Sequence, residues 1–124
     1  MKGLKKLTLT DASRDSLLSH FPPKFCSVHA THITIEFGNL SEQHYDLHNV
    51  KIIGYQATSY LEVLVVSINN AITRSQDKQI LHITLSTLQG IPPVCSNDVL
   101  NELLYLPLTK AFPLQVELQT ITFN

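Results

Sequence analysis

The chain has 124 residues and a formal net charge of −1; 44% of its residues are hydrophobic and 15% are charged. This length suits one domain, which we expect to span residues 1–124, and the apolar content excludes a disordered chain. The near-zero charge argues against binding of long nucleic acid, because that affinity comes from many Lys and Arg side chains. Arg14 and Arg74 are the two arginines, so a bidentate phosphate clamp is scarce.

Cysteine usage and hydropathy predict a soluble, cytoplasmic protein. Met1–Thr10 carries charge without the apolar core of a signal peptide. We therefore expect Cys26 and Cys95 to be reduced thiols. The longest apolar run, Leu61–Ile68, is much shorter than the roughly 20 residues that cross a bilayer. We expect no membrane segment.

The first half of the chain predicts a strand, a helix, a second strand and a loop. Leu4–Thr10 ends in apolar/hydroxyl alternation, which is the period of a strand. Asp11–His20 has helical apolar spacing; Thr10 or Asp11 can cap this helix, and Pro22-Pro23 stops it. His29–Phe37 alternates, and Gly38–Asn49 is polar and rich in turn residues.

Alternation sorts the side chains of this second strand onto two faces. The face expected against the core carries Ile33, Ile35 and Phe37. The polar face carries His32, Thr34 and Glu36. His29 is three residues from His32, an odd spacing that predicts the opposite face and a structural role.

The middle of the chain predicts three more strands. Val50–Tyr55 and Tyr60–Ile68 are rich in β-branched and aromatic residues, and the four residues between them suit a hairpin. Asn69–Lys78 is a polar connection. Gln79–Ser86 alternates again, with a polar front face made of Ile80, His82, Thr84 and Ser86.

The last part of the chain predicts a helix and a closing strand. Ser96 or Asn97 can cap the helix, and Pro107 stops it. Leu114–Phe123 alternates as a strand, with a phase slip near Gln119 that suits a bulge. With about six strands and two helices, the fold class is α+β, with antiparallel sheets and the helices outside them on one face.

Two strands share an almost identical motif. His32-Ile33-Thr34-Ile35 and His82-Ile83-Thr84-Leu85 each place an imidazole and a hydroxyl on one face, while the aliphatic residues anchor the strand. Hydrolysis of a phosphodiester needs one group to activate water and another to protonate the departing alkoxide, and histidine suits both roles near neutral pH. Threonine hydroxyls can donate to the phosphate oxygens as charge builds. This chemistry requires no metal.

The paired HITI and HITL motifs resemble those of the two-histidine (2H) phosphoesterase superfamily, whose signature is a pair of His-x-Thr/Ser-x motifs with hydrophobic x. The stretch HITLSTLQGIPPVCSN, together with the upstream HATHITIEFG, is especially similar to the small branch associated with RNA repair, which includes RNA ligase-like cyclic phosphodiesterases. The resemblance covers residues 5–123. It implies a bilobal, pseudo-two-fold α+β fold with one motif on each lobe.

The resemblance also implies an activity and a set of residues. The activity is hydrolysis or transesterification of 2′,3′-cyclic phosphates, 2′,5′-linked oligonucleotides or small cyclic nucleotides, without metal or other cofactor. By motif, His32 and His82 would be catalytic, and Thr34 and Thr84 would bind the phosphate. The chain is shorter than larger members and poor in arginine, so the expected partner is a nucleotide or short oligonucleotide.

Other residues are candidates for supporting roles. Tyrosine rings can stack on a base, and strand tyrosines are also ordinary core residues; these are Tyr45, Tyr55 and Tyr60. We predict Tyr45 and Ser86 as additional substrate-binding residues, with Glu36 and Ser86 beside the motifs. Cations that could neutralise phosphate are Lys24, Lys51, Lys78 and Arg74. His44 and His48 would suit a helical metal pair, but they lie in a predicted loop without further ligands, so we predict no metal site.

Three classes of function remain open at this point. The first is an enzyme that acts on a phosphodiester. The second is a non-catalytic module that uses the same cleft to bind a nucleotide or an RNA end. The third is an interaction domain in which His32 and His82 are half-buried strand residues without a common role. The separation of the two motifs in space distinguishes the third class from the others.

Overall fold

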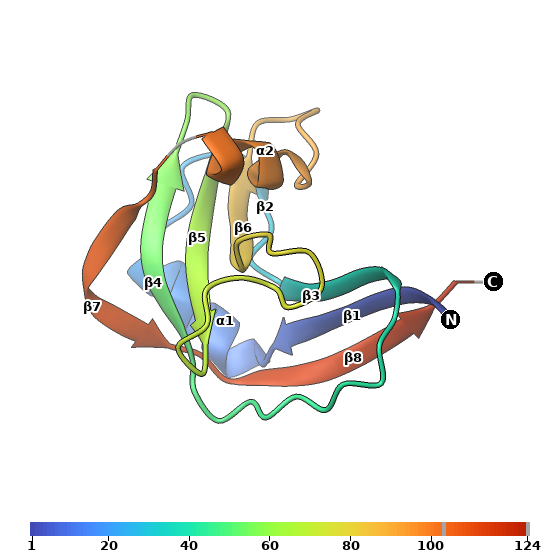
Figure 1. Cartoon of the computed structure of the whole chain (residues 1–124). Helices are drawn as coiled ribbons and strands as arrows, with labels where there is room; N and C mark the ends of the chain where they lie inside the picture. The colour runs from blue at the N-terminus through green and yellow to red at the C-terminus, as the bar shows by residue number, and fades with distance from the viewer. Residues whose placement is uncertain (103, 124) are drawn as a thin grey trace.

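The structure, a computed structural model, describes residues 1–102 and 104–123 (Figure 1). Within these residues the fold is α+β, with eight strands and two helices. In chain order the elements are β1 Lys2–Leu9, α1 Asp11–His20, β2 Ser27–Val28, β3 His32–Asn39, β4 Val50–Ala57, β5 Leu61–Ile68, β6 His82–Thr87, α2 Cys95–Glu102, β7 Leu106–Pro113 and β8 Val116–Thr122.

The strands form two antiparallel sheets. One has the order β3-β1-β8, and the other has the order β2-β6-β5-β4-β7. Figure 1 shows the three-stranded sheet extending away from the foot of the five-stranded sheet. The sheets approach each other at β3 and β6, which are in contact. The two strands that carry the His-x-Thr motifs therefore lie beside each other at the junction.

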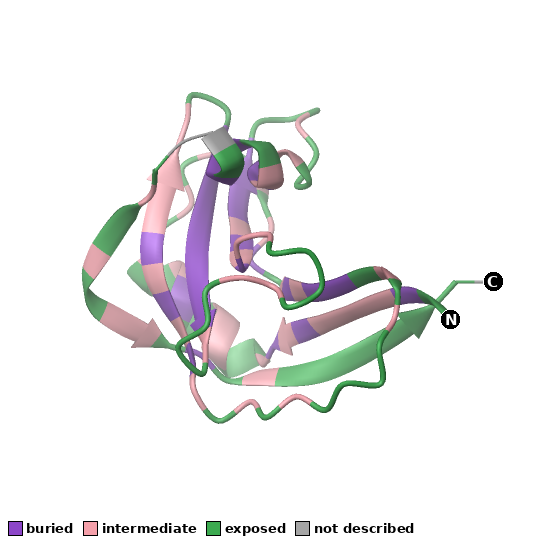
Figure 2. Cartoon of the chain, in the orientation of Figure 1, coloured by how far each residue is buried: buried purple, intermediate pink, exposed green. Residues whose placement is uncertain are grey.

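Two apolar clusters hold the sheets and helices together. The larger cluster lies where the two sheets face each other and includes Leu17 of α1, Ile33 of β3 and Leu64 of β5. The smaller cluster joins β5 to α2, through residues such as Val63 and Val99. Side chains of β5 alternate between the clusters, so this strand is buried on both faces (Figure 2).

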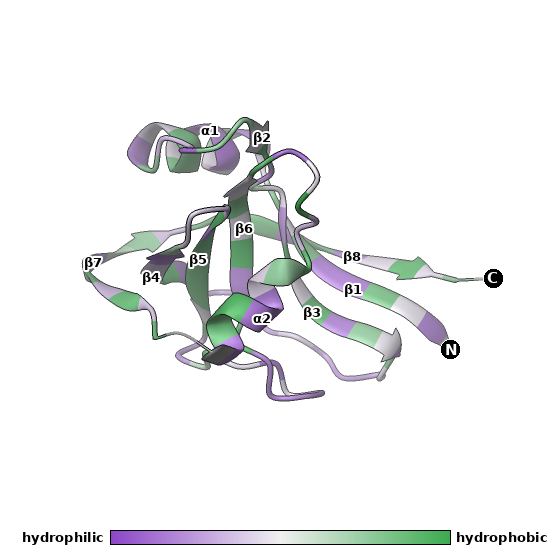
Figure 3. Ribbon diagram, turned by 90° about the horizontal axis from the view of Figure 1, so that it is seen from above, coloured by the Kyte–Doolittle hydropathy of each residue, from purple (hydrophilic) through white to green (hydrophobic). Residues whose placement is uncertain are grey.

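The two helices pack on opposite faces of the five-stranded sheet, as the view from above shows (Figure 3). The prediction that both lie on one face is therefore wrong. Helix α1 has the predicted bounds: the Thr10 hydroxyl caps it by accepting from the backbone N–H of Ser13 at 3.2 Å. Its one buried residue, Leu17, enters the larger cluster.

Several strand predictions need correction. Strand β7 was not predicted: it contains Pro107, which was expected only to end the helix, and Pro113. It is an edge strand that pairs with β4 alone, where a missing N–H is tolerated. The two-residue strand β2 is also unforeseen. Strand β8 pairs with β1 in one unbroken register, so the bulge predicted near Gln119 is absent from this ladder. Strand β3 begins at His32 rather than at His29.

A β-bulge lies at the last residue of each motif, directly after its threonine. In the β1–β3 ladder Glu36 pairs with Lys5 and Thr34 pairs with Lys6, which leaves Ile35 without a partner. In the β5–β6 ladder the register shifts in the same way and leaves Leu85 without a partner. Each bulge adds one residue and so inverts the alternation of side chains beyond it.

Inversion changes the faces of the residues that follow the motifs. Phe37, predicted to be core, is 61% exposed and lies on the same face as His32 and Thr34. Glu36 and Ser86, predicted to lie beside the motif residues, are buried on the opposite faces. Their predicted placement is wrong because the sequence alternation continues through both bulges without a visible break.

Candidate active site

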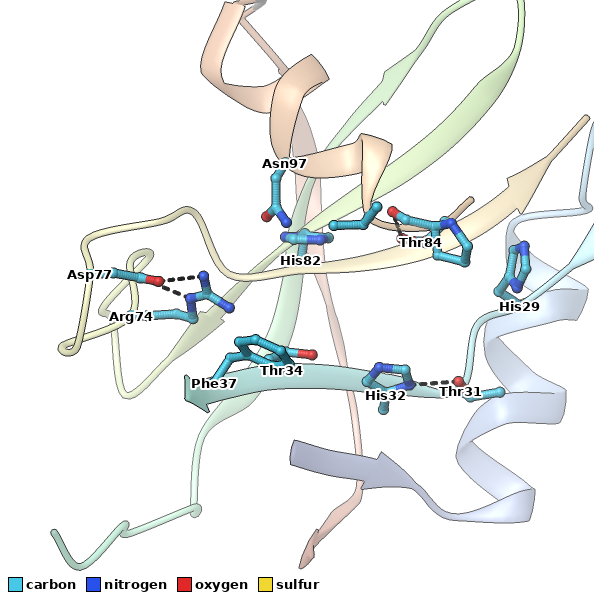
Figure 4. A pocket seen from close by; sticks show the side chains of 12 residues that line it. His29, Thr31, His32, Thr34, Phe37, Arg74, Asp77, His82, Thr84 and Asn97 are labelled. Carbon is cyan, nitrogen blue, oxygen red and sulfur yellow. Dashed lines mark hydrogen bonds and ion pairs between the residues drawn. The ribbon is translucent and has the colours of Figure 1, made fainter. Parts of the chain in front are cut away.

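A cleft between β3 and β6 brings the two motifs together. It has a volume of about 360 Å³ and is lined by His32 and Thr34 from one sheet and by His82 and Thr84 from the other (Figure 4). The remaining lining residues are His29, Thr31, Phe37, Arg74, Asp77, Pro93, Val94 and Asn97. The structure thus gathers the four residues of two motifs that lie 50 positions apart in sequence around one cavity.

The His82 imidazole has a defined tautomer. Its Nδ1 lies 2.8 Å from the carbonyl oxygen of Ile80, and a carbonyl only accepts, so Nδ1 carries the hydrogen. The neutral ring therefore keeps a lone pair on Nε2. Burial lowers the pKa of His82, with a further contribution from the Arg74 charge, and these outweigh the bond to Ile80, which acts in the opposite direction. Near neutral pH this side chain is a proton acceptor.

The His32 imidazole has a different partner. Its Nδ1 lies 2.8 Å from the Thr31 hydroxyl, which can donate or accept, so this hydrogen bond is compatible with either protonation state. Burial lowers the pKa of His32, followed by the positive charges of Lys6, His82 and His29. A charge on His82 thus disfavours protonation of His32.

The two threonines differ in their surroundings. The Thr84 hydroxyl lies 2.8 Å from the Ser96 hydroxyl of α2 and 3.3 Å from the Pro93 carbonyl oxygen. Ser96 is fully buried. No partner of the Thr34 hydroxyl is found among residues 1–102 and 104–123, and its side chain lines the cleft. Thr34 is therefore free to donate to a ligand, while Thr84 also connects β6 to α2.

A third histidine lines one end of the cleft. The chain turns at Ala30, which has a φ of 56°, before β3 begins, so the odd spacing from His32 does not place His29 on the opposite face. The His29 Nε2 lies 3.0 Å from the Thr87 hydroxyl. Arg14 donates from Nη2 to the His29 carbonyl oxygen at 2.9 Å. The prediction that His29 faces away from His32 is wrong, because residues 29–31 are not strand.

The other end of the cleft is formed by Phe37, Arg74 and Asp77 (Figure 4). Of the cations considered above, Arg74 lines the cleft; Lys24, Lys51 and Lys78 lie elsewhere on the described chain. Arg74 and Asp77 form an ion pair that the sequence analysis did not foresee. Asn97 of α2 also lines the cleft, and its buried Oδ1 has no hydrogen-bond partner within the described residues.

Tyr45 lies outside this cleft. Its hydroxyl donates to Glu36, and it lines a neighbouring cavity of about 330 Å³ that shares Arg74 with the cleft. Burial and the Glu36 carboxylate raise the pKa of Tyr45 to about 12. Burial alone would raise the pKa of Glu36, but hydrogen bonds from Ser41 and Tyr45 and the Lys5 charge outweigh it and hold the pKa below its ordinary value. Tyr45 therefore fixes the 40–49 loop to β3.

Ser86 also lies outside the cleft, in a second buried carboxylate site. Glu62, 3% exposed, accepts from the hydroxyls of Ser86 and Tyr55 and from the Lys24 backbone N–H. Glu36 has the same kinds of donors: a tyrosine hydroxyl, a serine hydroxyl and a backbone N–H. In each sheet a buried glutamate thus satisfies the polar groups behind the motif strand.

The predicted loop histidines do not form a metal cluster in the described part of the chain. His48 pairs with Asp46 at 2.9 Å, and both side chains are largely exposed. No group of three or more metal-ligating side chains occurs in residues 1–102 and 104–123. Within the same residues, no helix is long and apolar enough to cross a membrane.

Comparison of the chain with protein-family models, with curated proteins and with solved structures found no match. The case for a function therefore depends on the geometry of the cleft.

Proposed function

We propose that this chain is a phosphodiesterase with a 2H phosphoesterase-like fold, in which His32 and His82 act as a general acid/base pair. Its substrates would be 2′,3′-cyclic phosphate ends, 2′,5′-linked oligonucleotides or small cyclic nucleotides. The observation that carries the proposal is that equivalent residues of two matched motifs, on strands of different sheets, line one cavity of about 360 Å³. The matched bulges at the last residue of each motif add support for a pseudo-two-fold relation.

The hydrogen bonds favour different roles for the two histidines. His82, with its hydrogen on Nδ1, accepts a proton at Nε2 from the attacking water as the water oxygen bonds to phosphorus. His32 donates its proton to the departing alkoxide as the phosphorus–oxygen bond breaks. Because a phosphate anion between the rings favours the imidazolium form, substrate binding raises the pKa of His32 from its lowered value.

The threonines and the charge of the cleft fit a singly charged phosphate. Thr34 donates to a non-bridging oxygen, and Thr84 does the same when its weak 3.3 Å bond to Pro93 opens. The guanidinium of Arg74 is already paired with Asp77, so little permanent positive charge is left to balance a dianion. A cyclic phosphodiester, with one negative charge, suits this cleft better than a terminal phosphate or a polyphosphate.

Substitution of each histidine tests the proposal. His32→Ala and His82→Ala should each lower kcat by about 10²–10⁴-fold, and the double variant should be little worse, because acid and base act in one step. The assay uses purified protein with excess chelator and a panel of 2′,3′-cyclic nucleotides, 2′,5′-linked oligonucleotides and cyclic dinucleotides. His48→Ala is the control, since this exposed histidine pairs with Asp46 outside the cleft. Wild-type protein that hydrolyses no member of the panel would overturn the proposal.

One observation favours the alternative of a non-catalytic nucleotide- or RNA-end-binding module. Burial lowers the pKa values of both His32 and His82, so near pH 7 the cleft holds two neutral imidazoles and no ready acid. A binding module would show nucleotide binding by calorimetry with no product, and His32→Ala would weaken binding.

A further inference from the structure

The cleft extends past the histidines to an end that the proposed chemistry does not use. Phe37, Arg74 and Asp77 form this end, on the side away from His29 (Figure 4). In a 2′,3′-cyclic nucleotide both ester oxygens belong to one ribose, so with the phosphate between the histidines the base of that nucleoside extends to one side and can reach this end of the cleft. The side chains at this end therefore bear on which substrate fits.

The turn that carries Arg74 and Asp77 is closed by its own hydrogen bonds. The Arg74 backbone N–H donates to the Gln79 carbonyl at 2.8 Å, and the Lys78 N–H donates to the Arg74 carbonyl at 2.9 Å. Asp77 Oδ1 also accepts from the Gln79 N–H at 3.1 Å. The position of the guanidinium is thus set by a fixed turn rather than by an open loop.

The same turn is joined to strand β3 beside the phenyl ring. The Gln76 carboxamide accepts from the Phe37 backbone N–H at 2.9 Å and donates to the Asn39 carbonyl at 2.8 Å. One side chain thereby satisfies two backbone groups at the free edge of β3. The result is a common frame in which Phe37 and the Arg74–Asp77 pair keep their relative positions.

The ion pair leaves one edge of the guanidinium free. Asp77 binds Nε at 2.9 Å and Nη2 at 2.5 Å, which is the side-on arrangement, so the end-on pair of N–H groups on Nη1 and Nη2 remains. The Arg74 side chain is only 10% exposed. Figure 4 shows the nitrogen without a dashed line turned toward Phe37 and His82. Two parallel donors are thus fixed at the wall of the cleft.

Phe37 supplies a surface for a planar ligand. Its ring is 61% exposed although it lines the cleft, and its centroid lies 5.9 Å from that of Phe123 in an edge-to-face pair. An exposed ring beside a phosphate site is suited to stacking with a nucleobase. Purines present a larger face than pyrimidines for this contact.

Charge and geometry select the base edge. Asp77 neutralises the charge of Arg74, so the two parallel N–H donors on Nη1 and Nη2, which form a fork, are better suited to a neutral pair of acceptors than to a second phosphate. Guanine presents O6 and N7 as adjacent acceptors, which an arginine fork binds in a bidentate manner, whereas adenine presents N7 beside a donor. We propose that Arg74, fixed by Asp77, reads the O6/N7 edge of a guanine base stacked on Phe37.

This specificity deepens the proposed function, because it identifies the nucleoside attached to the phosphate. The first measurement is kcat/KM for the four 2′,3′-cyclic nucleoside monophosphates. The guanosine substrate should exceed the adenosine substrate by about 5- to 150-fold, the discrimination of one bidentate contact. Arg74→Lys keeps the charge but loses the fork, so the guanosine/adenosine ratio should fall toward one. Asp77→Asn, which loosens the fork, should lower the same ratio.

Lys78→Gly is the matched control. It removes an exposed cation from the same turn, outside the cleft, and glycine suits the positive φ of 63° at this position. The guanosine/adenosine ratio should stay at the wild-type value. Equal rates for the guanosine and adenosine substrates, or a ratio that survives Arg74→Lys, would overturn the specificity while the phosphodiesterase proposal stands.

A binding measurement separates failure of the specificity from failure of the enzyme. Guanosine and adenosine, which lack phosphate, are titrated into isotope-labelled protein and followed by NMR. Selective binding of guanosine that Arg74→Lys abolishes would support the base-reading site even if no cyclic nucleotide is hydrolysed. Equal binding of the two nucleosides, or binding that does not involve Phe37 and Arg74 signals, would refute it.

Discussion

The two motif threonines should respond differently to the same substitution. Thr34→Val and Thr84→Val each remove one hydroxyl and keep the β-branched shape that a strand favours. In the wild type the Thr84 hydroxyl lies 2.8 Å from that of Ser96, which is 0% exposed. Thr34 has no such neighbour in residues 1–102 and 104–123. The two substitutions thus remove the same group, but only Thr84→Val leaves a buried hydroxyl, that of Ser96, without its partner.

The expected magnitudes follow from that difference. A buried hydroxyl that loses its partner costs about 1–3 kcal/mol, so Thr84→Val should lower the free energy of unfolding by this amount. Thr34→Val should change it by less than about 0.5 kcal/mol, the usual range for a group without partners. The double variant Thr84→Val/Ser96→Ala removes both members of the pair and should recover most of the loss. In the proposed mechanism, each valine also lowers kcat by about 10²-fold.

Urea unfolding, followed by circular dichroism and fitted with a common slope, measures the free energies. The cyclic-nucleotide assay measures kcat on the same preparations. If Thr34→Val and Thr84→Val have equal free energies of unfolding, or if Ser96→Ala brings no recovery, the reading of Thr84 as a link between β6 and α2 is wrong. A kcat unchanged by Thr34→Val would show that its hydroxyl does not contact the phosphate.

Three further predictions concern buried charge and pH. Glu62→Gln should lower the free energy of unfolding by about 1–3 kcal/mol, because an amide cannot accept from all three donors. The exposed control Glu42→Gln should lower it by less than about 0.5 kcal/mol, and equal urea midpoints for the two variants would contradict this. His32 and His82 have pKa values below the ordinary 6.5, so the unfolded chain binds more protons there and the free energy of unfolding should fall as the pH drops from about 7 to 5. His82→Gln should reduce that slope in urea titrations at several pH values, and an unchanged slope would refute the assignment. The rate should follow a bell-shaped pH profile in excess chelator, because one imidazole must be neutral and its partner protonated; loss of activity on chelation, restored by a divalent ion, would exclude the proposed mechanism.

Sequence patterns predicted the regular parts of the fold well. Helix α1 has the predicted bounds because its signals are local: a capping hydroxyl at Thr10 and a proline after its end. The main strands β3 to β6 were found from alternation and β-branched residues. Strand β7 was missed because its two prolines argue locally against a strand, and only the pairing of one edge with β4 makes them acceptable.

The sequence singled out the residues at the centre of the candidate site, but at its ends it offered Arg74 only as one of four candidate cations and did not place His29, Phe37 or Asp77 there. Within each motif the histidine and the threonine share one face as predicted, because side-chain alternation within four residues is a local property. That the two motifs line one cleft depends on the packing of β3 against β6, which alternation does not predict. Phe37 was assigned to the core because the bulge at Ile35 leaves no mark in the alternating sequence. Arg74 and Asp77 come from a turn whose position beside β3 depends on the Gln76 side chain, a contact between residues far apart in sequence.

The matched bulges also affect how related chains are sought and how the motif is grafted. A four-residue pattern ends on the bulged residue itself, so it omits the buried fifth residue, which is Glu36 in one strand and Ser86 in the other. A designer who transplants only those four positions onto a regular ladder would turn the sixth residue away from the ligand. A useful search template therefore spans six positions, with an aliphatic fourth residue and a polar fifth residue, and a graft needs the extra residue in the recipient strand.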